Sequence, residues 1–245
     1  MNAFNLEERL KNIRRFYTIL NELEQEVGGK RTLGQCDGKK KWNWPVRGIY
    51  FFYEPGEERS TSGLGSRVVR VGTHALIYGG KRKLWDRLRA HKGVVGGEYP
   101  GGGDHRSSVF RLHVGTALIA KEGFSVPAKE NWGIGNSASD TIKRAEYPIE
   151  QAVSQHIRKK PFLWLEVDDP PGPESQRKYI ERNAIALLSN YRLPDLPIDP
   201  PSDNWLGKDA QNEDVQRSGL WNVQYVRECY DSSFLDVMER FIQLL

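Results

Sequence analysis

The stretch from residue 48 to residue 91 constrains the fold of this chain more than any other. It opens with the letters GIYFFY, which are rich in aromatic and β-branched residues and predict a strand. A polar, glycine-rich connection, EPGEERSTSGLGS, has the composition of a loop, and RVVRVG then predicts a second strand. Two strands joined by one loop pair antiparallel, so the sequence predicts a β-hairpin.

A helix is predicted directly after this hairpin, over the letters KRKLWDRLRAH. Leu84 and Leu88 are four residues apart, and a glycine just beyond the segment is typical of a helix end. Arg87 and His91 are also four residues apart, so they share a face at the edge of the apolar stripe that packs on the sheet. We therefore expect a guanidinium and an imidazole to lie close to Tyr50 on the first strand.

The rest of the chain predicts more helices and two further strands. Amphipathic spacing favours helices over residues 5–27, from Pro148 onward, over 175–190 and over 232–245. The apolar run FLWLEV predicts a third strand of the sheet, and LWNVQYV predicts another strand near the end. Residues 107–119 fit either a helix or a strand, whereas 121–140 and the proline-rich segment 192–219 are expected to be irregular.

Positive charge is concentrated around the hairpin. The chain has a net charge of +4, and lysines and arginines form runs at residues 39–41 and 81–83. Clustered cations contact phosphate groups in nucleic-acid-binding proteins, although such runs are also typical of an ordinary solvated surface. Beside a chemical motif, the runs favour a nucleic acid as the partner.

Composition argues against several classes of protein. With 245 residues, the chain is long enough to bury the core of one elaborated domain. Its two cysteines, Cys36 and Cys229, lie far apart and predict neither a zinc site nor a disulfide framework. No apolar run is long enough to span a membrane, and the first residues lack the apolar core of a secretory signal. A cytoplasmic protein is the expectation.

The GIY letters, the second strand ending in VG, and the arginine and histidine four apart resemble the GIY-YIG nuclease family. The resemblance covers residues 45–120 well and later segments loosely. It implies an α/β (α+β) fold, with a small mixed or antiparallel three-stranded sheet flanked by helices, and it favours a helix over 107–119. A single domain over 1–245 is expected: an N-terminal helix and basic linker (1–44), the catalytic core (45–190), and a proline-rich insertion, strand and closing helix (191–245).

Glu181 is the candidate metal ligand. It lies inside the apolar arc of the helix predicted over 175–190, which is a costly place for a carboxylate unless it is paired or binds a cation. The resemblance implies that this glutamate holds a single Mg²⁺ or Mn²⁺ ion. The alternative is an ion pair with Arg177 or Lys178.

The resemblance also implies the other site residues. The catalytic set that it gives is Tyr50, Arg87, His91 and Glu181. Further candidates are Arg70, His74, Arg106 and Asn222. His74 and Arg106 are candidates by their positions in the chain alone, and for both a loop role is the alternative. Arg70 stands where the family has its second tyrosine, so the motif reads RVG instead of YIG. For the family's asparagine, Asn190 and Asn204 compete with Asn222.

The function implied by the resemblance is a metal-dependent DNA endonuclease acting on double-stranded DNA. Tyr50 would take a proton from the attacking water, which requires a neighbouring cation to favour its ionised form. No zinc finger or helix-turn-helix is recognisable, which favours a restriction-like enzyme, and cutting both strands favours a homodimer. The alternatives are a catalytically degenerate nucleic-acid-binding module and a structure-specific DNA repair nuclease.

Overall fold

A four-stranded antiparallel sheet lies at the centre of the molecule. The computed structural model describes residues 6–39, 42, 44–94 and 96–245. Within these residues the strand order is β1-β4-β2-β3, and all pairs are antiparallel. The strands are β1 (Arg31–Thr32), β2 (Gly48–Glu58), β3 (Ser66–Gly72) and β4 (Pro161–Glu166). The predicted α/β class is confirmed, and the short strand β1 adds a fourth member to the three strands expected.

The predicted hairpin is confirmed as β2 and β3. Its register places Tyr50 opposite Gly72 and Phe52 opposite Arg70. Strand β4 pairs with the other side of β2, so β2 is internal and β3 forms one edge of the sheet. The glycine of GIY is required by this packing, because a Cβ on Gly48 would lie 2.5 Å from the Leu165 carbonyl oxygen.

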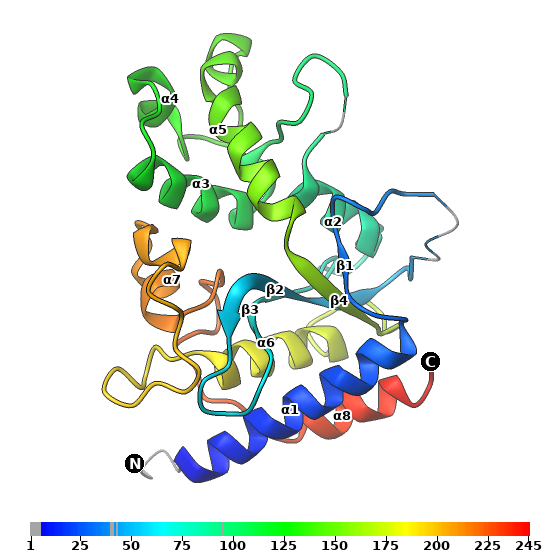
Figure 1. Ribbon diagram of the computed structural model, residues 1–245. Helices are drawn as coiled ribbons and strands as arrows, with labels where there is room; N and C mark the ends of the chain where they lie inside the picture. The colour runs from blue at the N-terminus through cyan, green and yellow to red at the C-terminus, as the bar shows by residue number, and fades with distance from the viewer. Residues whose placement is uncertain (1–5, 40–41, 43, 95) are drawn as a thin grey trace.

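Two layers of helices cover the two faces of the sheet (Figure 1). Side chains alternate along β2, so Ile49 and Phe51 point to one face while Tyr50 and Phe52 point to the other. The first face is covered by α1 (Leu6–Glu26), α6 (Gln176–Leu188) and α8 (Phe234–Ile242). The second face is covered by α2 (Leu84–Lys92), α3 (Val109–Lys121) and α5 (Asp140–Arg158).

Helix α1 has a structural role in this arrangement. Its apolar side, which includes Phe16 and Leu20, is buried in the core of the first face. It therefore covers one face of the sheet. In the described residues, no helix combines the length and apolar character needed to cross a membrane.

Three predicted elements were wrong in part. Helix α5 begins at Asp140 rather than at Pro148, because Ser139 caps it by accepting a hydrogen bond from the Ile142 amide at 3.4 Å. Pro148 lies inside the helix and costs it one backbone donor. The segments expected to be irregular contain α4 (Val126–Asn131), η3 (Leu206–Asp209) and α7 (Glu213–Ser218).

The strand predicted over 220–226 does not form. Tyr225 adopts a positive φ of 65°, which interrupts an extended backbone. The segment nevertheless reaches the edge of β3, where the Trp221 amide donates to the Val69 carbonyl at 2.7 Å. The apolar pattern was therefore correct about burial, and wrong about secondary structure.

Candidate active site

Tyr50 is the central residue of the candidate site. Its side chain is fully buried on the second face of the sheet and crosses the neighbouring strand at Gly72. A Cβ on Gly72 would lie 2.3 Å from the Tyr50 hydroxyl oxygen, which is closer than atoms can approach. The glycine of the RVG motif therefore makes room for the phenol.

His91 binds the phenol from α2. Its Nε2 atom is 2.8 Å from the Tyr50 hydroxyl, and its Nδ1 atom is 2.8 Å from Oγ of Ser108. Ser108 also caps α3 by accepting the Arg111 amide at 3.2 Å. Burial, together with the charges of nearby arginines, lowers the pKa of His91 well below its ordinary 6.5. The imidazole is therefore neutral, with one nitrogen donating and the other accepting.

Arg70 lies beside the phenol, on the neighbouring strand β3. Its guanidinium donates to the Trp221 carbonyl and lies 4.8 Å from the Phe110 ring centre. Burial lowers the pKa of Arg70, while its interactions with Tyr50 and Glu181 raise it. Its buried Nε atom has no hydrogen-bond partner among the described residues. Arg70 thus places a desolvated positive charge next to Tyr50.

Arg87 is the more accessible guanidinium of the site. It is half-buried on α2 and donates through Nη1 to the Ser107 carbonyl at 3.1 Å. Arg87 is one helical turn before His91, as the spacing predicted, and its charge is among the causes that lower the pKa of His91. An accessible arginine fork in this position suits the recognition of a phosphate.

Glu181 reaches the site from α6 on the opposite layer. Its Oε1 atom accepts the Thr73 amide at 3.1 Å. Some of its surface faces a pocket, although protein atoms closely surround the carboxylate. Burial raises the pKa of Glu181 to about 7, and the nearby charge of Arg70 is the largest opposing cause. The carboxylate therefore lies near protein cations, but none of them neutralises its charge directly.

The ion-pair alternative for Glu181 does not match the contacts of α6. Arg177 pairs instead with Asp169 and donates to the His74 carbonyl at 2.7 Å. Within the described part of the chain, neither Arg177 nor Lys178 forms an ion pair with Glu181. A carboxylate that is buried, unpaired and open to a pocket fits an oxygen ligand for a divalent cation.

One pocket of about 230 Å³ brings these groups together. It lies beyond the edge strand β3, where the two helical layers meet, because Tyr50 comes from one face and Glu181 from the other. Its polar lining consists of Tyr50, Arg70, Thr73, Arg87, Glu181, Asn222, Gln224 and Tyr225. The pocket can therefore present a phenol, two guanidinium groups and one carboxylate to a phosphate.

Asn222 lines the same pocket and also binds the edge of the sheet. Its Oδ1 atom accepts the Val71 amide at 3.1 Å, and its Nδ2 atom donates to the Val71 carbonyl at 2.8 Å. The competing Asn190 makes a similar pair with Ile198, away from the pocket. Asn204 is exposed and does not line the pocket, so Asn222 is the candidate asparagine that the fold brings to the site.

Two of the further candidates lie outside the pocket. His74 is at the base of the loop after β3, where Nε2 is 3.1 Å from the Val46 carbonyl oxygen, and burial lowers its pKa to about 4. Arg106 forms a buried ion pair with Glu146 at 2.7 Å in the helical layer. The expectation that Arg106 shares the cleft is therefore not met, because its guanidinium is already bound within this layer.

Tyr225 is a pocket residue that the sequence did not indicate. It has a positive φ of 65°, which is unusual for a residue with a bulky side chain, and such strain is typical of functional sites. Burial raises the pKa of Tyr225, and the nearby charge of Glu181 adds to this effect. The letters around Tyr225 fit a strand, so no sequence signal marked the residue.

A second group of possible metal ligands lies elsewhere, formed by Asp104, His105 and Glu150. His105 Nδ1 is 2.9 Å from Glu150, and its Nε2 accepts the Gly133 amide at 3.1 Å. Glu150 also forms a buried ion pair with Arg111. Both nitrogens of the imidazole and the charge of Glu150 are thus satisfied internally, which leaves Glu181 as the better ligand.

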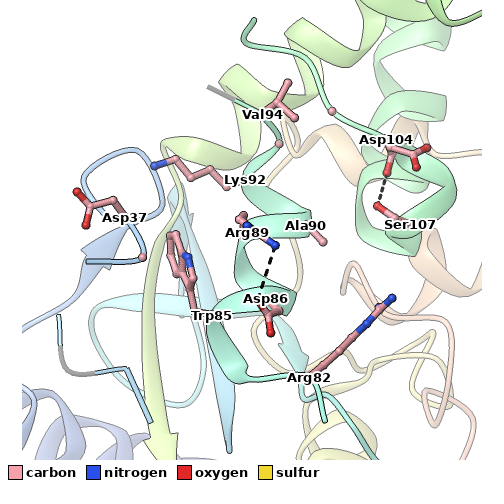
Figure 2. A pocket seen from close by; sticks show the side chains of 13 residues that line it. Asp37, Arg82, Trp85, Asp86, Arg89, Ala90, Lys92, Val94, Asp104 and Ser107 are labelled. Atoms are coloured by element: carbon pink, nitrogen blue, oxygen red, sulfur yellow. Dashed lines mark hydrogen bonds and ion pairs between the residues drawn. The ribbon is translucent and has the colours of Figure 1, made fainter. Parts of the chain in front are cut away.

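A larger cavity within the described residues is separate from this pocket. It has a volume of about 920 Å³ and lies on the opposite side of α2, beside Trp85, Arg89 and Lys92 (Figure 2). The Trp85 ring stacks on Trp44, with their centres 4.9 Å apart. Neither Tyr50 nor Glu181 lines this cavity, so the size of a cavity does not identify the candidate site here.

Comparison with known proteins gives one match. A family model described as "GIY-YIG domain" matches residues 7–245, which is nearly the whole chain. A search of curated proteins and a search of solved structures each found no match.

Proposed function

The chain belongs to the GIY-YIG domain family, whose members are nucleases, and from this membership we propose that it is a divalent-metal-dependent DNA endonuclease. The substrate is double-stranded DNA, and the reaction is hydrolysis of a phosphodiester bond. One observation carries the proposal: Tyr50 from β2, Arg87 from α2 and Glu181 from α6 line a single pocket. A proton acceptor, a phosphate ligand and a metal ligand are the groups that this reaction requires.

Tyr50 is the proton acceptor in this mechanism. Its ionised phenol takes a proton from the water whose oxygen attacks phosphorus, and the bond to the leaving oxygen breaks. His91 orients the phenol by donating Nε2–H to it, while Nδ1 accepts the hydroxyl proton of Ser108. Ser108 can donate in this direction because its oxygen accepts the Arg111 amide. A neutral His91 serves as a positioning residue rather than as a proton store.

The two arginines have different roles. Arg70 is buried beside Tyr50, so it places a fixed positive charge next to the residue that takes the proton. Arg87 is more accessible and stabilises the negative charge that develops on the phosphoryl oxygens. In this reading, the arginine of the RVG motif supports Tyr50 by charge, at the position where the family has a second phenol.

Glu181 is the residue that would hold Mg²⁺ or Mn²⁺. A carboxylate oxygen is a suitable ligand for either ion, and the Thr73 amide fixes the orientation of the other oxygen. A divalent ion at this position supplies Lewis-acid stabilisation of charge on the phosphate and the leaving oxygen. Binding the ion also offsets the cost of burying an unpaired carboxylate.

A restriction-like role is the finer part of the proposal. Candidate recognition elements are the glycine-rich segment 92–106 and the proline-rich excursion 192–219. Each chain carries one catalytic pocket of this kind in its described residues, so cutting both strands at one site favours a homodimer. The recognition sequence is to be determined from the cleavage products.

The proposal predicts that Glu181→Gln abolishes Mg²⁺-dependent cleavage and preserves DNA binding. The variant keeps an oxygen that can accept the Thr73 amide, but it loses the charge that attracts the ion. We expect at least a 100-fold loss of nicking of supercoiled plasmid and a change in Kd for DNA of less than about threefold. Cleavage is measured with Mg²⁺ and with EDTA.

Glu239→Gln is the matched control, because Glu239 is a half-buried acid on α8 that pairs with Arg15 at 2.8 Å and lies outside the pocket. It should cleave like the wild type. Equal loss of DNA binding and cleavage in Glu181→Gln would contradict the metal assignment.

The second candidate is a nucleic-acid-binding module without catalysis. The observation that favours it is Arg70 at the position where the family has a tyrosine. A binding module would give no Mg²⁺-dependent product on any duplex and would tolerate Glu181→Gln. The plasmid assay therefore separates the two candidates.

A further inference from the structure

Two apolar residues project from the loop between β3 and α2. Ile77 is 83% exposed and Tyr78 is 89% exposed. They form the tip of a tight turn, in which the Gly80 amide donates to the Ile77 carbonyl at 2.9 Å and Gly79 has a φ of +76°. Glycine at the third position is what a type II turn requires. The turn holds the two side chains outward, with nothing in the described residues covering them.

The base of this loop is attached to the candidate active site. The Thr73 amide binds Glu181, and the His74 carbonyl accepts Arg177. Leu76 lines the catalytic pocket itself. Tyr78 follows Leu76 by two residues, so at most about 7 Å of extended chain separates the tip from the pocket wall. The loop therefore presents its apolar tip beside the place where a scissile phosphate binds.

Three consecutive cations follow the tip. Lys81, Arg82 and Lys83 are exposed, and none of them forms an ion pair in the described part of the chain. Figure 2 shows the Arg82 side chain extending from the segment that leads into α2. Duplex DNA has an anionic backbone around an apolar stack of bases. Unpaired cations next to an exposed apolar tip are complementary to both of these features.

We propose that Ile77 and Tyr78 form a wedge that inserts between adjacent base pairs of duplex DNA beside the scissile phosphate, while Lys81–Lys83 bind the backbone. The inference rests on the proposed function in taking duplex DNA as the ligand. Insertion of apolar side chains unstacks a base step and bends the duplex. Bending brings the phosphate into a pocket that lies beyond the edge of the sheet.

The test measures unstacking directly, in EDTA, where no cleavage occurs. The probes are 40-base-pair duplexes of mixed sequence with 2-aminopurine at several positions, since its fluorescence rises when a base is unstacked. Wild-type protein should raise the fluorescence on binding at least twofold. The double variant Ile77→Ser with Tyr78→Ser should still bind DNA and should lose most of this increase. Because both side chains are exposed, the variant should keep the wild-type Tm.

Leu64→Ser is the matched control, because Leu64 is 90% exposed on the hairpin loop and no run of three consecutive cations follows it there. It should retain the fluorescence increase. Replacing Lys81, Arg82 and Lys83 with alanine should weaken binding and reduce the slope of log Kd against log salt by up to about 3.

The fluorescence and cleavage results together distinguish failure of the wedge from failure of the nuclease proposal. Mg²⁺-dependent cleavage without any wild-type fluorescence increase would overturn the wedge alone. Unstacking without cleavage would support the wedge and contradict the nuclease. Failure to bind duplex DNA would overturn both. Conversion of a dimer to a monomer by the serine variant, measured by sedimentation, would instead assign the tip to contacts between copies of the chain.

Discussion

At the scale of single residues, the glycines at the two ends of the hairpin, Gly48 and Gly72, are required by the atoms that pack against them. Gly48 admits the Leu165 carbonyl, and Gly72 admits the ring of Tyr50. Neither glycine has a positive φ, so their backbone conformation is open to other residues. It is the close approach of a neighbouring atom that requires glycine at each position.

Gly72→Ala should therefore displace the Tyr50 phenol without unfolding the protein. A Cβ at this position would meet the phenol at 2.3–2.7 Å, so the phenol must shift from the position in which it binds His91. We expect a loss of cleavage of at least 100-fold with little change in KM or DNA affinity. The cost in stability should be about 1–3 kcal/mol, measured by urea unfolding.

Val71→Ala is the control. Val71 is adjacent to Gly72, but its side chain points into the core on the other face of the sheet, away from Tyr50. It should lower stability by a similar amount and keep most of the cleavage activity. Activity retained in Gly72→Ala would mean that the position of the phenol is not needed.

At the scale of elements, the irregular C-terminal segment completes the edge of the sheet. Trp221 and Asn222 bind the β3 backbone where a further strand would otherwise pair. The start of the excursion is fixed as well. Asp199 accepts the amides of Ser60, Thr61 and Ser62 at 3.0, 2.8 and 2.9 Å. The excursion thus holds the hairpin loop, and the residues directly after it hold the hairpin edge.

Asp199→Ala should destabilise the protein by about 2–4 kcal/mol, because three loop amides lose their shared acceptor. Asp199→Asn keeps an oxygen acceptor and should cost clearly less. The measurement is the free energy of unfolding in urea. Equal effects of the two variants would show that the negative charge, rather than the hydrogen bonds, is what stabilises the loop.

At the scale of the whole molecule, several histidines are buried in their neutral form. Burial lowers the pKa of His74 and of His113 to about 4, and it lowers the pKa of His91 well below 6.5. The unfolded chain therefore binds protons on these groups before the folded chain does. Stability from this source is fully present above about pH 6.5 and is lost as the pH falls toward 4.

Replacing His113 tests this relation outside the catalytic pocket. Between pH 7.5 and 5.5, the wild type should lose about 1 kcal/mol of unfolding free energy through His113 alone. His113→Gln should be less stable at pH 7.5, since it alters a buried position, but its stability should fall less over this range. Urea unfolding at the two pH values gives both quantities. An equal fall in the two proteins would contradict the lowered pKa of His113.

The local part of the fold and of the site was predictable from the sequence. The hairpin, α2 and the side-by-side placement of Arg87 and His91 follow from residue spacing, since the periods of strands and helices fix which side chains share a face. The unusual burial of Glu181 was also predictable, because an acid inside an apolar arc stands out in the helical pattern.

The distant part of the site was decided only by the tertiary structure. Glu181 joins Tyr50 because two helical layers meet beyond β3, and Asn222 reaches the same pocket by binding a strand edge. Tyr225 enters it through a strained backbone that no letter pattern signals. Arg106, which the sequence placed near the site, is bound by Glu146 instead. Spacing along the chain determines neighbours within one element, whereas contacts between elements depend on how the two buried faces pack.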